Sequence, residues 1–312
     1  MITVTRAVCL QMICGGLSAI NRCFYYLVGE ISLWGVSMKD SYFSAKVFGC
    51  EKPVIGMVHL PPLPGAHRHT TMSVEDVIEF ALRDAAALSG GGVDGLQVEN
   101  ISDKPFIKPG SIGFEASNMV AAVAREVKHS FGLPVGVFVL ANGVAESVSA
   151  ALASGASWIR VNMFNLAYVA DEGFIEAGAG IAERLKNYLG PKIALLVDVL
   201  AKHGSHQIVS DLPFEYHVRR AEELGAEAVV VSGTRTGRAV PAEKVAEAKH
   251  VAAKPVFVGS GVDAANVERL LSIADGAIVG TYFKRGGFLS NPVDVDRVRQ
   301  LMDVVKRLRS RI

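Results

Sequence analysis

Two segments near the C-terminus decide the fold: PVFVGSGV at residues 255–262 and GAIVGTYFK at residues 276–284. Each is a short apolar run, rich in β-branched residues, that stops at glycine, which is typical of a buried strand followed by a turn. Asp263 is placed to open a helix between the two runs. The pair therefore predicts two successive βα units of a parallel sheet.

The same alternation of strand and helix patterns runs back from these segments to Pro53. A capping box from Ser73 to Asp76 opens one helix, and Asn291-Pro292 is expected to open the last. Eight such units favour an α/β fold of one domain, a (β/α)8 TIM barrel, over an open doubly wound sheet. The predicted strands are 53–60, 95–100, 134–140, 158–164, 192–200, 228–234, 255–261 and 276–281.

The first 37 residues differ from the rest, with few charges and three of the four cysteines. We interpret 1–37 as an N-terminal extension whose start codon is wrongly assigned, and 38–312 as the barrel that begins at Met38. The uncharged run 7–20 is shorter than the about 20 apolar residues of a membrane span. A targeting or membrane-surface segment stays open as the alternative.

The composition limits the partners and the compartment. The chain has 32 basic and 31 acidic side chains and a formal net charge of +1, so no overall field attracts nucleic acid. All four cysteines precede the first predicted strand, and no disulfide is needed to hold the barrel. We therefore expect a cytoplasmic protein that does not bind nucleic acid.

Glycines after the last two predicted strands indicate a phosphate site. Without Cβ atoms in the way, backbone N–H groups there can approach an anion, and this corner of the barrel is a recurrent phosphate site. Small polar residues after the sixth strand suit phosphate or sugar oxygens. We predict that Gly261→Asp abolishes anion binding before it affects folding. The alternative is that these glycines only make tight turns and that Lys284, the lysine after the last strand, is solvated. The predicted binding set is Ser232, Gly233, Thr234, Gly259, Ser260, Gly261, Gly280, Thr281 and Lys284.

Four polar residues near strand ends are the catalytic candidates: His59, Glu99, Asn162 and Asp198. Two buried carboxyl groups in one cavity can divide acid and base roles, because burial and mutual repulsion separate their pKa values. An equally weighted alternative is a structural network in which Arg160 pairs with Glu99 or Asp198.

The segment DVLAKHGSH at residues 198–206 raises two further ideas. His203 and His206 could bind a metal with Asp198, but the spacing matches no recognised metal pattern. Lys202 as a Schiff-base nucleophile ranks lower still. We therefore predict no metal and no other cofactor.

The motifs IGMVHLPPLPG, GVDGLQVEN with DKPF, IRVNMF, VDVLAKH, AVVVSGTRTG, PVFVGSGV, DGAIVGTYFK and NPVDVDRV occur in order at the strand ends. Together they resemble the BtpA (BtpA/SgcQ) family over nearly all of the chain after Lys52. The resemblance implies a ribulose-phosphate-binding-type TIM barrel. The family takes its name from photosystem I biogenesis, in which its protein is peripherally associated with the membrane.

Two functions follow as hypotheses. The first is an isomerase- or lyase-type enzyme that acts on a phosphorylated sugar or ribose-bearing metabolite, by analogy with phosphoribosyl isomerases and the indole-forming lyase of the same barrel type. The second is a non-catalytic assembly or stability factor for a membrane complex. A phosphorylated small molecule is the expected partner, while peripheral membrane association and a homo-oligomer are left open.

Overall fold

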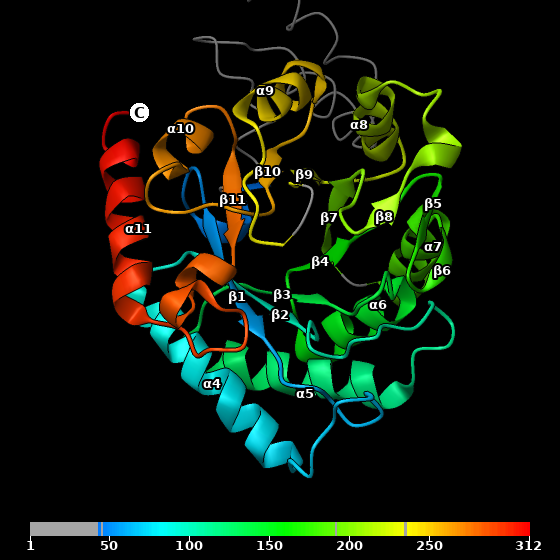
Figure 1. The fold of residues 1–312 in the computed structure, drawn as a ribbon, viewed down its shortest axis with the longest axis vertical. Coiled ribbons are helices and arrows are strands. Elements are labelled where there is room, and N and C mark those ends of the chain that lie inside the picture. Colours follow the sequence, from blue (N-terminus) through cyan, green and yellow to red (C-terminus); the bar gives the residue numbers. More distant parts are fainter. Residues whose placement is uncertain (1–42, 45, 191, 234–235) are drawn as a thin grey trace, which may run out of the picture. The chain divides into compact units, whose positions relative to one another are not determined.

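The computed structural model describes residues 43–44, 46–190, 192–233 and 236–312 (Figure 1). The predicted extension 1–37 and Thr234 lie outside the described residues. Eight parallel strands close into a barrel, which confirms the predicted fold and excludes the open sheet. Closure is direct, because Ile55 of the first strand stands opposite Ile278 of the last. The strands are β1 (Val54–His59), β2 (Gly95–Glu99), β3 (Val135–Phe138), β4 (Trp158–Val161), β7 (Ala194–Val199), β9 (Ala228–Val231), β10 (Val256–Val258) and β11 (Gly276–Val279).

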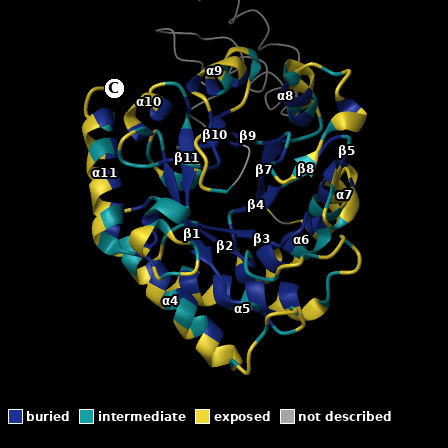
Figure 2. Cartoon of the chain, viewed as in Figure 1, coloured by how far each residue is buried: buried dark blue, intermediate teal, exposed yellow. Residues whose placement is uncertain are grey.

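Helices cover the outside of the barrel, with buried residues on the face toward the strands and exposed residues outside (Figure 2). The capping box of Ser73 and Asp76 is present at the first of them. The last helix begins at Val295 behind Asp294, so the prediction that Asn291-Pro292 opens it was wrong. The helices are α4 (Val74–Gly91), α5 (Phe114–Phe131), α6 (Val144–Ser154), α7 (Ala179–Leu189), α8 (Phe214–Glu223), α9 (Ala242–Val251), α10 (Val267–Leu271) and α11 (Val295–Arg309). Among the described helices, none combines the length and hydropathy of a membrane span.

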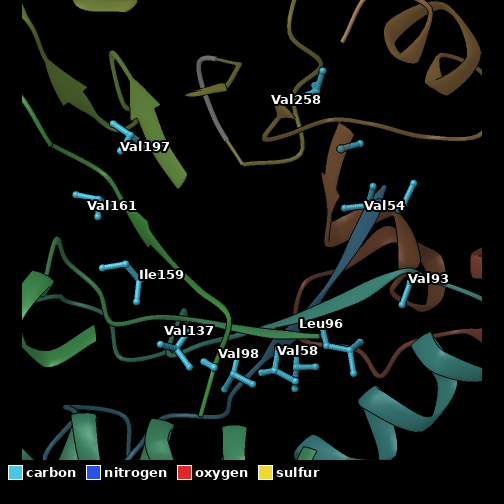
Figure 3. Close-up of a cluster of buried hydrophobic side chains, with 14 of the residues drawn as sticks. Val54, Val58, Val93, Leu96, Val98, Val137, Ile159, Val161, Val197 and Val258 are labelled. Carbon is cyan, nitrogen blue, oxygen red and sulfur yellow. The ribbon is translucent and has the colours of Figure 1, made fainter. Parts of the chain in front are cut away.

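Side chains alternate along each strand between the helices and the barrel interior. Figure 3 shows Val58, Val98 and Val137, on β1, β2 and β3, within the cluster that packs between strands and helices. Ile55 and Met57 belong to a separate cluster inside the barrel. The interior face of each strand therefore continues, at its carboxyl end, into the mouth of the barrel, where active sites of this fold lie.

Aromatic rings fill part of the interior. A Cβ at Gly136 would lie 2.0 Å from Nε1 of Trp158, so the large ring requires glycine on the neighbouring strand. The same Nε1 donates a hydrogen bond to Oε1 of Gln97 at 3.0 Å. Phe43 packs against Phe257 with ring centroids 6.0 Å apart. The barrel core therefore includes residues upstream of the first strand.

Two βα loops form a small antiparallel sheet that the sequence patterns did not predict. It joins β5 (Ala167–Ala170) and β6 (Gly173–Glu176), in the loop after β4, to β8 (Gly204–Ser205), in the loop after β7. The predicted strands 158–164 and 192–200 are correspondingly shorter, ending at Val161 and Val199. Pairing of two βα loops fixes one side of the barrel mouth.

Candidate active site

The alternation along β1 and β2 brings the first two candidates together. His59 and Glu99 are the last residues of these strands and stand opposite each other in the ladder. Both are buried, at 7% and 5% exposure. Since Ile55 and Met57 face the interior, His59 two positions further on faces the same way, at the mouth.

Two cavities open at this mouth. A cavity of ≈ 240 Å³, here called the corner cavity, reaches the glycines after β10 and β11, and one of ≈ 380 Å³, the side cavity, reaches Phe106, Phe138 and Tyr168. They share the lining residues Glu99, Ile101, Arg160, Lys202 and Thr236. The cavities therefore meet at a charged junction, and together they form one site with two ends.

Five residues of the predicted phosphate set line the corner cavity: Gly259, Ser260, Gly261, Gly280 and Thr281. Gly261 has a φ of +65°, and a Cβ there would lie 2.1 Å from the backbone nitrogen of Ala239. Any side chain at Gly261 must therefore displace backbone. The expectation that Gly261→Asp spares the fold is corrected, because charge is not the first obstacle at this position.

Two members of the set support the corner without lining it. The Ser232 hydroxyl donates to Oδ1 of Asp198 at 3.0 Å. The N–H of Gly233 donates to Oγ of Ser260 at 2.7 Å. These groups hold the loop after β9 against its neighbours, whereas Thr236 and Gly237 of the same loop do line the corner cavity.

Lys284 was assigned wrongly to the phosphate set. Its ammonium group is bonded to the carboxylate of Asp84 on α4, and its side chain is 1% exposed. Lys284 lines neither cavity. The buried pair explains the placement, since an ammonium this deeply buried needs a counter-charge.

Arg297 of α11 supplies a cation to the corner cavity instead. Its Nε donates to the carbonyl oxygen of Tyr282 at 2.6 Å, and its guanidinium lies 4.5 Å from the Tyr282 ring centroid. Both contacts orient the group. Sequence reasoning missed Arg297, because an arginine among aspartates and arginines in the first turns of a helix has the pattern of a solvated face.

Asp198 takes part in the structural ion pair that was the alternative to a catalytic role. Nε of Arg160 is 2.7 Å from Oδ2 of Asp198, and Nη2 is 2.8 Å from Oδ1. Asp198 lines neither cavity, while Arg160 lines both. The carboxylate therefore orients Arg160 and is not placed to contact a ligand.

Glu99 is the carboxyl group at the junction. It lines both cavities and is buried. Desolvation raises the pKa of this carboxyl above its ordinary value, against the opposing effect of the Arg160 charge. A carboxyl group with a raised pKa can hold a proton near neutral pH and pass it to a ligand.

His59 contributes a neutral ring. Desolvation, followed by the charge of Lys284, holds its pKa well below the ordinary value. Nδ1 of the ring is buried and has no hydrogen-bond partner among the described residues. A Cβ at Gly280 would lie 2.6 Å from Cε1 of this ring, so the glycine after β11 also makes room for His59.

Asn162 lies at the side cavity, away from the glycine corner. Its side chain hydrogen-bonds Tyr168 of β5, and burial raises the pKa of that phenol. Phe138 and Leu140 add apolar surface to the same cavity. Arg68, Lys104, Asp171 and Glu172 line this cavity too, so its wall combines apolar and charged side chains.

The metal hypothesis gains no support from the geometry. Nε2 of His203 pairs with Oγ1 of Thr236 at 3.0 Å, while Nε2 of His206 pairs with the carbonyl oxygen of Ala201 at 2.7 Å. Asp198 is engaged with Arg160. Within the described part of the chain, no group of three or more His, Cys, Asp or Glu side chains is arranged to hold a metal ion.

Comparison with known proteins identifies the family. The sequence model of a protein family, described as the BtpA family, matches residues 50–307. The chain belongs to the BtpA family. A relative named photosystem I biogenesis protein BtpA, from Synechocystis, is 36% identical over 83% of this chain and 90% of its own. An uncharacterized protein of Thermococcus kodakarensis is 42% identical, covering 83% and 97% of the two chains.

Solved structures share the barrel of this BtpA-family protein at low identity. Tryptophan synthase from M. tuberculosis superposes with a TM-score of 0.55 at 17% identity, covering 87% of this chain and 99% of that one. Thiamine phosphate pyrophosphorylase from Pyrococcus furiosus gives 0.51 at 14% identity, covering 82% and 96%. These likenesses concern the fold.

Proposed function

We propose that this BtpA-family barrel is an isomerase- or lyase-type enzyme acting on a phosphorylated sugar or ribose-bearing metabolite. The observation that carries the proposal is the position of Glu99: a buried carboxyl with a raised pKa at the junction of the corner and side cavities. A proton carrier at that point adjoins the middle of any ligand that spans both ends.

The corner cavity is suited to the phosphate. Gly261 leaves its backbone exposed toward the cavity, and its N–H forms no hydrogen bond with another described residue. Arg297 brings a positive charge to the same cavity. Backbone N–H groups next to glycine, together with one guanidinium, are a common way for proteins to bind phosphate. The name of the pyrophosphorylase neighbour, which includes a phosphate compound, agrees with this use of the fold.

The remaining groups have distinct roles in this proposal. Glu99 transfers the proton, and neutral His59 hydrogen-bonds a ligand oxygen beside it. Arg160, fixed by Asp198, stabilises negative charge that develops at the junction. Asn162 binds a hydroxyl or carbonyl group in the side cavity.

The name of the Synechocystis relative supports the second candidate, a non-catalytic assembly factor for a membrane complex. The junction favours the enzyme, because a scaffold has no need for a buried carboxyl of raised pKa beside a cavity. Cytoplasmic location, peripheral membrane association and self-association stay predictions.

A ligand screen tests the proposal. The full chain is melted with inorganic phosphate, sugar phosphates and nucleotides, and with the same sugars lacking phosphate. We expect selective stabilisation by phosphorylated compounds, because a ligand that binds only the native state raises the melting temperature. Equal melting with every compound would remove the basis of the enzyme proposal.

A further inference from the structure

Lys202 has no part in the proton transfer proposed above, yet it lies where that transfer would occur. It follows β7 and lines both cavities. Its amine takes part in none of the hydrogen bonds or ion pairs found among the described residues. Lys284, which is fully buried near the mouth, is paired with Asp84, whereas Lys202 is half-buried. A half-buried amine with no counter-charge in contact with it, at the junction of two cavities, needs an explanation.

We propose that the Lys202 amine is a nucleophile that forms an imine with the carbonyl carbon of a phosphorylated aldehyde or ketone. The inference rests on the proposed function for the phosphate end of the ligand and adds the chemical class of its reacting group. Lys202 and Glu99 are both junction residues, so a carbonyl there reaches the amine and the acid together.

The surroundings keep the amine reactive. Desolvation and the positive charge of Arg160 lower the pKa of Lys202 to about 8, against the opposing effects of Asp198 and Glu99. An ordinary lysine is almost fully protonated at pH 7.5, whereas this one is neutral in a substantial fraction of molecules. Asp198 does not quench the effect, since its two oxygens are bonded to Arg160.

The step balances with the groups present. The Lys202 nitrogen attacks the carbonyl carbon, forming a C–N bond while the π electrons of the carbonyl move to its oxygen. A proton leaves the nitrogen for this oxygen, and the Glu99 carboxyl supplies a second proton. The oxygen departs as water while the nitrogen lone pair forms the C=N bond. One amine, one carbonyl and one carboxylic acid thereby give a protonated imine, water and the Glu99 carboxylate.

The resulting pair of charges defines the next reaction. A protonated imine accepts electrons from an adjacent C–H or C–C bond, and the Glu99 carboxylate is the base available at the junction. Removal of a C–H proton leads to isomerisation, and removal of a hydroxyl proton leads to C–C cleavage. Both lie within the proposed reaction classes.

Borohydride trapping tests the imine. The full chain is incubated separately with dihydroxyacetone phosphate, glyceraldehyde 3-phosphate and ribose 5-phosphate, each with sodium borohydride, and its mass and peptides are then measured. We expect one stable adduct, on Lys202, with at least one of these compounds. Lys202→Met should give none, while Lys108→Met, a matched change at an exposed lysine that lines neither cavity, should keep it.

Binding of inorganic phosphate, measured by calorimetry in parallel, separates this inference from the proposed function. Phosphate binding without an adduct overturns the imine and leaves the phosphate site standing. Absence of both overturns both. An adduct that persists in Lys202→Met also refutes the inference. If that variant does not fold, Lys202→Arg takes its place: it keeps the charge, so phosphate should still bind, yet no adduct should form.

Discussion

The guanidinium of Arg160 holds both carboxylate oxygens of Asp198 inside the barrel, with side chains that are 5% and 2% exposed. Ser232 adds a third hydrogen bond to the same carboxylate. The pair links β4 and β7, which are neighbours in the barrel. Asp198 supplies the counter-charge of a guanidinium that is buried away from bulk water. We therefore expect loss of Asp198 to lower the stability of the fold.

Asp198→Asn should therefore lower the free energy of unfolding by about 3 kcal/mol, since removal of one partner leaves a buried charge without its counter-charge. Urea denaturation followed by circular dichroism measures the loss. Asp296→Asn, which breaks the exposed pair with Arg299 on α11, is the matched control and should change little. Equal stability of the Asp198 variant and the native chain would contradict a structural role for the pair.

Glu99→Gln should leave the fold intact and remove activity. Glutamine has the shape of the protonated carboxyl that burial favours at this position, but it cannot transfer a proton. Turnover of a compound selected in the ligand screen should fall by about 10²- to 10⁴-fold. Its affinity, measured by calorimetry, should stay within a few-fold. A variant that turns over normally would show that Glu99 is not the acid.

Gly261→Ala should destabilise the chain nearly as much as Gly261→Asp, because the first added carbon already meets the backbone of Arg238 and Ala239. Melting temperatures of both variants measure the effect. Gly110→Ala is the control, since Gly110 also has a positive φ, +83°, but has open space around its Cβ position. If Gly261→Ala melts like Gly110→Ala, backbone strain alone explains the glycine.

Arg297→Met should weaken binding of inorganic phosphate by about tenfold, because it removes a charge-assisted contact and keeps an unbranched apolar side chain. Calorimetric titration measures the affinity. Arg299→Met, on an exposed side chain of the same helix, should leave the affinity unchanged. Equal affinities in the two variants would place the phosphate elsewhere.

Stability should fall as the pH drops below about 6.5, the ordinary pKa of histidine. Burial depresses the pKa of folded His59, so between its folded and unfolded pKa values the unfolded chain binds more protons, and unfolding becomes easier as the pH falls. His59→Asn should flatten this slope. Melting curves between pH 5 and 7.5 test it, and parallel curves for both chains would argue against a buried neutral ring.

The sequence predicted the barrel well because each strand carries its own signal. The run VIGMV at residues 54–58 and the run AVVV (Ala228–Val231) contain only apolar residues and glycine, which marks strands buried on both faces. Period-two alternation then places His59 and Glu99 at one mouth without further information. The small sheet of β5, β6 and β8 was missed because four-residue strands with exposed positions lack a distinct pattern.

Partner choice could not be predicted, since it depends on contacts distant in sequence. Lys284 follows a glycine of the corner, which suggested a phosphate ligand, yet its partner Asp84 is 200 positions away. Asp198 and Glu99 have the same residue pattern at strand ends, but only the former receives the Arg160 guanidinium. Local spacing gives the face and depth of a side chain and leaves its partner undetermined.

The bond between Asp84 and Lys284 also has a consequence for synthesis of the chain. The carboxylate of Asp84 additionally accepts the N–H of Val293 at 2.8 Å, so both of its partners come from the final segment. A ribosome that has made the first seven units has produced an acidic side chain whose partners are still unmade. Since domains fold as units while the chain emerges, the barrel can close, and its corner cavity can be completed, only after the segment with Lys284 and Val293 has been made. Ligands of the corner cavity would then distinguish chains that contain this segment from chains that stop before it.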